Sequence, residues 1–288
     1  MSVRAISLSP LFGLLFTISI FIPPSTAAVD SFLYGGCSPM KYNPGTPYES
    51  NVNSIMSSIV NSASFTTYNT FKISVPGSSS SDVVYGLFQC RGDLSNSDCR
   101  YCVARAVSQL GVLCVDSTGG AIQLDGCLVK YDNVTFIGVE DKTVVLRKCG
   151  PLIGYDGEEL SRRDSVLDYL ASGGQFFRVS GSGRVRGVAQ CVQDLSPSQC
   201  QDCLGEAIRR LKNDCQSAAW GDMFLGKCYA RYTERRDGSD NVAGSHEESN
   251  DDEVEKTLAI LIGLIAGIAL LVVFLSFLNK VFENKDGK

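Results

Sequence analysis

Histidine is almost absent from this chain of 288 residues, and the single one, His246, lies in an acidic, polar stretch near the C-terminal end. Ser-His-Asp and Cys-His catalysis need an imidazole base, which the part of the chain that we expect to fold does not contain. Zinc sites of mixed cysteine and histidine type are excluded there for the same reason. Neighbouring acids such as Glu158 and Glu159 are typical of a solvated surface. We predict a protein that is not an enzyme and holds no cofactor or metal ion.

A surplus of positive charge is missing as well. The sequence contains 26 Lys and Arg residues against 31 Asp and Glu residues, which gives a formal net charge of −5. Proteins that bind nucleic acid carry basic patches or stripes that neutralise phosphates, and this charge balance offers none. We therefore expect no nucleic-acid partner.

Long apolar runs occur at only two places. The first covers residues 11–22, comes after Arg4 and precedes a group of small residues. It is too short to span a bilayer, and its layout is typical of a secretory signal peptide. We predict a signal peptide at residues 1–28, cleaved after Ala27 or Ala28. The mature chain would then fold in an oxidising compartment, where disulfides persist.

The second apolar run covers residues 257–278, which are 22 residues without a charge. As a helix it would be about 33 Å long, enough to cross the hydrocarbon core of a bilayer. Acidic residues precede it and lysines follow it, which places the preceding part of the chain outside the cell. We predict a single-pass type I membrane protein. Its flexible acidic stalk would cover residues 234–256, and its cytoplasmic tail, residues 279–288, would be too short for a kinase domain.

Two glycines within the predicted membrane helix, Gly263 and Gly267, are four residues apart. Small residues at this spacing allow two helix backbones to approach closely in lipid. Glycine is also common in membrane helices that do not associate. We predict that this face supports self-association or association with a partner receptor.

Twelve cysteines organise the part of the chain between the two apolar runs. They form two sets of six, and the last five of each set differ by a constant offset of 101 residues, as from Cys90 to Cys191. This offset indicates an internal duplication, with copies at residues 29–136 and 137–233. The first cysteine breaks the offset, so the second copy has lost residues, which we place near residues 77–82. The sets are Cys37, Cys90, Cys99, Cys102, Cys114, Cys127 and Cys149, Cys191, Cys200, Cys203, Cys215, Cys228.

Three cysteines and an Arg-Gly-Asp tripeptide share one stretch, CRGDLSNSDCRYC at residues 90–102. The tripeptide becomes Val-Gln-Asp at residues 192–194, so only the aspartate persists, close to a helix start where a carboxylate is favoured. This favours a turn over an adhesion site. A redox site would need Cys99 and Cys102 to join each other, and an all-cysteine zinc site would compete with oxidation. We interpret the stretch as a disulfide staple at a strand-to-helix junction.

Each copy predicts an α+β domain with helices packed on an antiparallel sheet. Residues 82–90 are typical of a strand, and residues 121–133 of paired strands. A helix should begin at Ser95, and Ser196 repeats this start with Pro197 after it and Gln199 three residues on. Two apolar stripes at helical spacing follow, namely Cys102, Val103, Ala106, Val107, Leu110 and Cys203, Leu204, Ala207, Ile208, Leu211. Earlier helices are indicated near residues 52–63 and, more weakly, near residues 166–170.

The doubled pattern Cys90-x8-Cys99-x2-Cys102 and Cys191-x8-Cys200-x2-Cys203 resembles the plant cysteine-rich domain of ginkbilobin and of the cysteine-rich receptor-like kinases. Two such domains, one membrane span and almost no cytoplasmic part resemble the plasmodesmata-located proteins. Spacing alone leaves the disulfide connectivity open. The resemblance implies pairing of first with fifth, second with third and fourth with sixth cysteine. These pairs are Cys37–Cys114, Cys90–Cys99, Cys102–Cys127, Cys149–Cys215, Cys191–Cys200 and Cys203–Cys228.

The resemblance also implies a function. It predicts a receptor-like protein of the plasma membrane at plasmodesmata, which regulates cell-to-cell trafficking and callose deposition and acts in defence and virus movement. Its expected partners are the membrane, copies of itself or partner receptors, viral movement proteins and cell-wall carbohydrate. The alternative is a membrane-anchored, carbohydrate-binding and antifungal ectodomain like that of ginkbilobin.

Ginkbilobin binds mannose, and its sugar site uses an Asn just after the first cysteine, an Arg six before the last and a Glu five after the last. The resemblance places these positions at Ser38, Ala121 and Asp132 in the first copy, and at Gly150, Asp222 and Thr233 in the second. Only Asp132 keeps a comparable group, and the bidentate donor of the Arg is missing from both copies. We expect no mannose binding at these positions. Asn133, next to Asp132, begins the glycosylation sequon Asn-Val-Thr.

Overall fold

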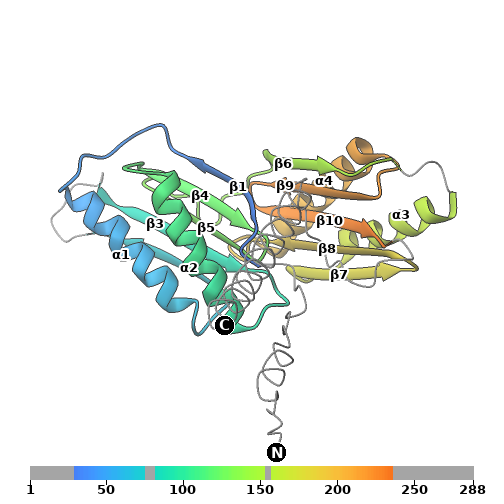
Figure 1. Ribbon diagram of the computed structural model, residues 1–288, viewed down its shortest axis with the longest axis horizontal. Helices are drawn as coiled ribbons and strands as arrows, with labels where there is room; N and C mark the ends of the chain where they lie inside the picture. The colour runs from blue at the N-terminus through green and yellow to red at the C-terminus, as the bar shows by residue number, and fades with distance from the viewer. Residues whose placement is uncertain (1–28, 75–81, 153–156, 236–288) are drawn as a thin grey trace, which may run out of the picture. The chain divides into compact units, whose positions relative to one another are not determined.

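The computed structural model describes residues 29–74, 82–152 and 157–235 (Figure 1). The predicted signal peptide, the predicted membrane span with Gly263 and Gly267, and nearly all of the predicted stalk lie outside these residues. Within the described ranges, no helix is both long enough and apolar enough to cross a membrane.

The first repeat consists of five strands and two helices. Its antiparallel sheet has the strand order β1-β4-β5-β3-β2, so the first strand lies at one edge and the second at the other (Figure 1). The elements are β1 (Phe32–Cys37), α1 (Pro47–Ser62), β2 (Tyr68–Ile73), β3 (Val84–Cys90), α2 (Asn96–Leu113), β4 (Gly119–Leu124) and β5 (Cys127–Asp132).

The second repeat has the same architecture, with the strand order β6-β9-β10-β8-β7. Its elements are β6 (Val144–Cys149), α3 (Gly157–Ser172), β7 (Phe177–Ser182), β8 (Val185–Cys191), α4 (Pro197–Cys215), β9 (Trp220–Leu225) and β10 (Cys228–Glu234). The prediction of two tandem α+β domains with helices on an antiparallel sheet is confirmed. Strand β10 extends to Glu234, one residue into the predicted stalk.

The helices α2 and α4, which contain the last two cysteines of the doubled motif, begin where the sequence predicts. In the first repeat, the backbone N–H of Asp98 donates to Ser95 Oγ at 3.2 Å. In the second, the N–H of Gln199 donates to Ser196 Oγ at 3.3 Å, and the N–H of Ser196 donates to Gln199 Oε1 at 2.9 Å. This reciprocal arrangement is a capping box. It satisfies backbone donors that the first helical turn leaves free.

The length difference between the repeats lies mainly in one loop. The connection between β2 and β3 spans residues 74–83, whereas the connection between β7 and β8 spans only residues 183–184. The loss of residues in the second copy therefore falls mostly where the broken cysteine offset predicts it.

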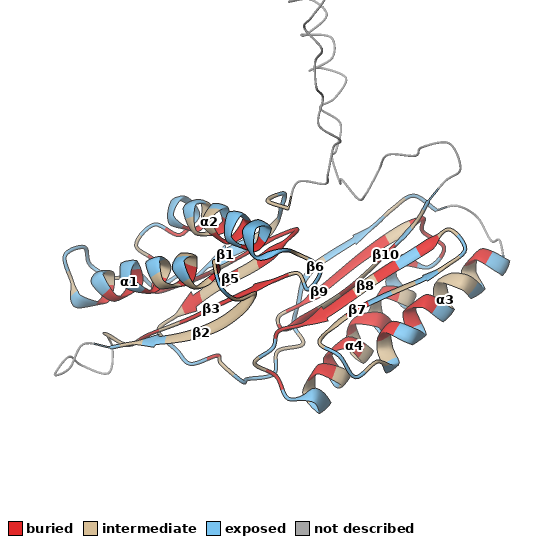
Figure 2. Ribbon diagram, turned by 90° about the horizontal axis from the view of Figure 1, so that it is seen from below, coloured by how far each residue is buried: buried red, intermediate tan, exposed pale blue. Residues whose placement is uncertain are grey.

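The core of each repeat lies between its sheet and its two helices (Figure 2). Buried positions follow the inner faces of α2 and α4 and alternate along the strand β5. The predicted apolar stripes supply core residues from both helices, namely Cys102, Val103, Ala106, Leu110 and Cys203, Leu204, Ala207, Ile208, Leu211. These residues belong to the apolar cores of the two repeats.

Six disulfides staple the helices to the sheets, and they are the six pairs that the family resemblance implies. In each repeat, the first joins an edge strand to the C-terminal end of a helix, the second spans the strand-to-helix junction and the third joins that helix to a central strand. No described cysteine is free. The pairs are Cys37–Cys114, Cys90–Cys99, Cys102–Cys127, Cys149–Cys215, Cys191–Cys200 and Cys203–Cys228.

Candidate functional site at the junction of the two repeats

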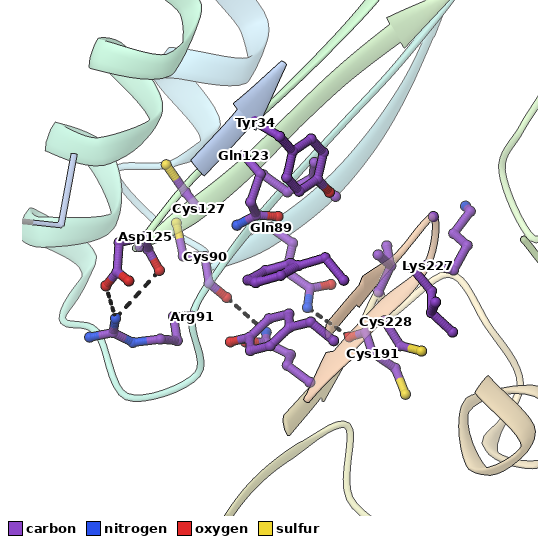
Figure 3. A pocket seen from close by; sticks show the side chains of 18 residues that line it. Tyr34, Gln89, Cys90, Arg91, Gln123, Asp125, Cys127, Cys191, Lys227 and Cys228 are labelled. Atoms are coloured by element: carbon purple, nitrogen blue, oxygen red, sulfur yellow. Dashed lines mark hydrogen bonds and ion pairs between the residues drawn. The ribbon is translucent and has the colours of Figure 1, made fainter. Parts of the chain in front are cut away.

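The two repeats belong to one compact unit, and two glutamines tie their central strands together. Gln89 in β3 donates from Nε2 to the carbonyl oxygen of Cys191 at 2.8 Å, and Gln190 in β8 donates to the carbonyl oxygen of Cys90 at 2.9 Å (Figure 3). The internal duplication relates the two glutamines, so the exchange is reciprocal. Both side chains are buried, and leaving either amide unpaired there would cost free energy.

A buried charge cluster lies beside these glutamines. Asp125, in the turn between β4 and β5, pairs with Arg91 of its own repeat and with Arg231 of the second, whose Nη1 lies 2.6 Å from Asp125 Oδ1. Arg231 also donates from Nε to Asp222 Oδ1 at 2.8 Å. Burial alone would lower the pKa of Arg231, but the charges of Asp222 and Asp125 outweigh it and raise that pKa. Arg231 therefore stays charged and bridges the repeats.

Phe136, in the segment between the repeats, is wedged against both of them. Its ring packs with Leu87 of β3 and with Val192 of the second repeat. The Nζ atom of Lys130 lies 4.6 Å from the ring centroid, and that of Lys227 lies 5.4 Å from it. A ring between two ammonium groups gains cation–π attraction in addition to its buried area. Phe136 thus anchors the connecting segment to both repeats.

A buried ion pair holds the same segment from the side of the second repeat. The side chains of Lys227 and Asp194 form an ion pair and are 4% and 1% exposed. Lys227 also donates to the carbonyl oxygen of Phe136 at 2.9 Å, and the N–H of Gly138 donates to Asp194 Oδ2 at 2.9 Å. Burial lowers the pKa of Lys227, and pairing with Asp194 opposes that shift.

The Arg-Gly-Asp tripeptide is part of this junction, and its arginine and aspartate pair with each other. Arg91 Nε donates to Asp93 Oδ1 at 2.7 Å, and Arg91 also pairs with Asp125. Gly92 packs against the second repeat so closely that an added Cβ would lie 2.4 Å from Phe177 Cγ. The cation, the glycine and the acid are all engaged within the protein. This arrangement agrees with the interpretation of the tripeptide as a turn.

A small cavity lies at the junction, lined among others by Tyr34, Gln89, Gln123, Gln190 and Tyr229 (Figure 3). Its volume is about 30 Å³, and a cavity needs roughly 10–15 Å³ to hold a water molecule. Burial raises the pKa of Tyr229 far above its ordinary value, so its hydroxyl stays neutral. The contacts around this cavity hold the two repeats together.

The first repeat uses its sugar-site positions for local hydrogen bonds. Ser38 Oγ accepts from the N–H of Met40 at 3.2 Å and from Thr118 Oγ1 at 3.1 Å. Asp132 Oδ1 accepts from the N–H of Val134 at 3.1 Å. The third position, Ala121, contributes only a methyl group. No arginine or asparagine occupies these positions to hold a sugar.

In the second repeat, the residues at two of these positions pack against a side chain or belong to the charge cluster. An added Cβ on Gly150 would lie 2.5 Å from Trp220 Nε1, so the indole covers that backbone. Asp222 stands where the family has arginine, and it pairs with Arg231 on the neighbouring strand. Thr233, the last position, lies in β10. An arginine is thus present nearby, but it binds Asp125 and Asp222.

Several of these residues have no role in the sequence-based predictions. Local sequence does not indicate the interactions of four of them, because their partners lie far along the chain or in the other repeat. These residues are Phe136, Lys227, Asp125 and Arg231. Gln89 could have been found, since an amide retained by both copies in an apolar strand indicates a specific partner. Among the described residues, no cluster of three or more His, Cys, Asp or Glu side chains could hold a metal ion.

Two disulfide-stapled α+β repeats, joined by a buried polar junction, define a tandem cysteine-rich domain pair. Residues 36–134 and 158–235 match the salt stress response/antifungal family. Plasmodesmata-located protein 6 of Arabidopsis thaliana is 60% identical over 269 residues, covering 91% of this chain and 93% of the relative. Plasmodesmata-located protein 7 of the same plant is 55% identical, covering 96% and 91%. The chain therefore belongs to the plasmodesmata-located proteins, within the salt stress response/antifungal family.

Solved structures agree with this assignment. The crystal structure of the tandem DUF26 ectodomain of the Arabidopsis thaliana cysteine-rich receptor-like protein PDLP5 superimposes with a TM-score of 0.68 at 45% identity, and it covers 72% of this chain and 100% of its own. The corresponding ectodomain of PDLP8 gives a TM-score of 0.69 at 44% identity. The likeness extends over both repeats.

We predict that the ectodomain does not bind mannose at the ginkbilobin-like positions, because the arginine and asparagine donors are missing and the remaining groups are engaged. Calorimetric titration with mannose and mannan should give no heat of binding. Millimolar or tighter binding that is abolished by changing Ser38 or Asp132 would contradict this. A Ser54→Ala variant, on the exposed face of α1 and in contact with none of these positions, serves as the matched control.

Proposed function

We propose that this protein acts as a receptor-like type I membrane protein at plasmodesmata, where it regulates cell-to-cell trafficking and callose deposition and takes part in defence or virus movement. The observation that carries the proposal is the extent of the likeness to plasmodesmata-located protein 6. The match spans 91% of the chain, whereas the solved ectodomain of a relative spans 72%. The similarity therefore includes segments outside the two repeats, which any targeting or membrane anchoring would use.

In this proposal the protein acts through binding and assembly and carries out no catalysis. Gln89, Gln190 and Phe136 are buried between the repeats, and in this proposal a ligand binds to the outer surface of the repeat pair. Its proposed partners are the membrane, other copies or partner receptors, viral movement proteins and cell-wall carbohydrate. Gly263 and Gly267 are the proposed contact in the membrane, since small residues let helix backbones approach.

A fluorescent fusion imaged in leaf epidermis against a callose stain tests this function. We expect puncta that span the wall and coincide with callose, because the close relatives are plasmodesmata-located proteins. Raising the amount of the protein should also reduce movement of a small diffusible fluorescent protein between cells. A uniform plasma-membrane signal, with unchanged movement, would contradict the proposal and favour a general lectin-like role.

Variants of the same fusion show whether copies associate through the predicted membrane helix or through the two repeats. Replacing both Gly263 and Gly267 with Leu should reduce energy transfer between differently tagged copies while the chain still inserts. A pair of bulky changes on the opposite face of the helix, Ile265→Phe and Val272→Phe, is the matched control. If the double Leu variant associates and forms puncta like the original chain, the contact lies in the ectodomain.

A further inference from the structure

The sequon Asn133-Val134-Thr135 stands at a place where the two repeats differ. We propose that Asn133 carries an N-linked glycan, which shields the sugar-site edge of the first repeat. The proposal rests on export of the chain, which the proposed function also requires. It adds a modification site that neither the family likeness nor the disulfide framework supplies.

The local fold keeps the sequon open. Strand β5 ends at Asp132, and the chain bends at once. The bend is fixed by Asp132 Oδ1, which accepts from the N–H of Val134 at 3.1 Å, in the manner of an Asx turn. Val134 is 64% exposed, and Thr135 is exposed as well. Asn133 is half-buried, and among the described residues its side chain makes no hydrogen bond, so a sugar on its amide displaces none.

The second repeat shows what the fold does at this position when no sequon is present. The offset of 101 residues places Glu234 opposite Asn133. There the strand continues, and the N–H of Glu234 donates to the carbonyl oxygen of Ala219 at 2.8 Å. The carboxylate of Glu234 pairs with Arg184 at 3.1 Å. The fold can therefore extend and use this residue, and the first repeat instead bends the chain and leaves Asn133 without a partner.

The chemistry needs only a lipid-linked oligosaccharide, the donor used in the secretory pathway. The Asn133 amide nitrogen forms a bond to the first sugar carbon, the bond from that carbon to the lipid diphosphate breaks, and the nitrogen loses one proton. A hydrated oligosaccharide one residue from Asp132 would cover the exposed Val134. It would also crowd the edge at which ginkbilobin holds mannose. The first repeat would then present its own sugar there.

Mass spectrometry of the full chain, produced in a plant secretory host, tests the proposal. Trypsin cuts after Lys130 and Lys142, so the sequon lies in a single peptide, residues 131–142. Enzymatic removal of N-glycans in ¹⁸O-water should convert Asn133 to labelled Asp within this peptide. Thr135→Ser keeps the sequon and should keep the label, whereas Thr135→Ala should lose it.

Asn133→Gln should likewise abolish the label and increase the mobility of the intact protein on a gel. Because Asn133 makes no hydrogen bond, the variant should fold and retain six disulfides, which a thiol count checks. The proposal is overturned if peptide 131–142 comes entirely unmodified from exported, thiol-free protein. That result would leave the proposed function untouched, whereas failure of export would count against both. A label that persists in Thr135→Ala would also overturn it.

Discussion

Replacing Lys227 with Met should lower the free energy of unfolding by about 3–5 kcal/mol, the usual cost of removing one partner of a buried ion pair. The change leaves the carboxylate of Asp194 without its cation at a site where it is 1% exposed. It also removes the donor to the carbonyl oxygen of Phe136. Equilibrium unfolding of the ectodomain in guanidinium would measure the loss as a lower midpoint.

Two variants in the same chain show whether burial is the cause. Combining Lys227→Met with Asp194→Asn removes both charges and should recover much of the stability, since replacing both partners of a buried pair is often close to neutral. The equivalent aspartate of the first repeat, Asp93, pairs with Arg91, and these side chains are 49% and 21% exposed. Asp93→Asn should therefore cost less than about 1 kcal/mol. If Asp93→Asn and Lys227→Met lowered the free energy of unfolding equally, burial of the ion pair would not be the cause of the loss at Lys227.

The sequence predicts the fold of each repeat because the relevant signals are local. The capping box at Ser196 and Gln199 lies within four consecutive residues. The apolar stripe of α4 is read from one turn to the next. Because each element occurs in both copies, a strong signal in one copy supports a weak signal at the equivalent place in the other. The helix pattern at residues 52–63 in this way supports the weaker helix pattern near residues 166–170. Elements of this kind need no knowledge of which strands pair.

The junction could not be predicted in the same way, because its contacts join residues that are distant in sequence. Gln89 reaches Cys191, and Arg231 reaches Asp125, across the boundary between the repeats. The sequence predicts that the aspartate retained in both copies favours a helix start through the helix dipole. In the structure, the Asp194 carboxylate instead binds Lys227 and the N–H of Gly138. The counterpart of Lys227 in the first repeat is Gly126. Comparison of the two copies therefore gives no indication of the Lys227–Asp194 ion pair.

The sugar-site positions show a partial success of the same kind. The sequence predicts correctly that Asp222 replaces the arginine of the family pattern. It does not reveal that Arg231 lies directly across from Asp222 in the β9–β10 ladder, because cross-strand register is a property of the folded sheet. The pair is used to bind Asp125 in the other repeat. A position that holds a ligand in a relative thus serves here to join two domains.

Replacing Cys37 and Cys114 together with Ala should lower the free energy of unfolding by about 4.5 kcal/mol. The reason is that this bridge closes a long loop, with a sequence separation of 77 residues, and so restricts the unfolded chain. Chain-closure entropy gives about 2.7 kcal/mol for Cys90–Cys99, with a separation of 9 residues. The counterpart of the long bridge in the second repeat, Cys149–Cys215, has a separation of 66 residues, which gives about 4.4 kcal/mol. It is the matched control, and its loss should nearly equal that of Cys37–Cys114.

Packing is the competing explanation, and burial separates it from chain closure. Cys90 and Cys99 are 1% and 0% exposed, so truncating them removes two buried sulfur atoms, whereas in the long bridge Cys114 is buried and Cys37 is exposed. If closure dominates, opening the long loop should also raise the denaturant m-value, because the unfolded chain then exposes more surface. Removing Cys90–Cys99 should leave the m-value nearly unchanged. A larger stability loss at Cys90–Cys99, with equal m-values, would show that these staples act by filling the core.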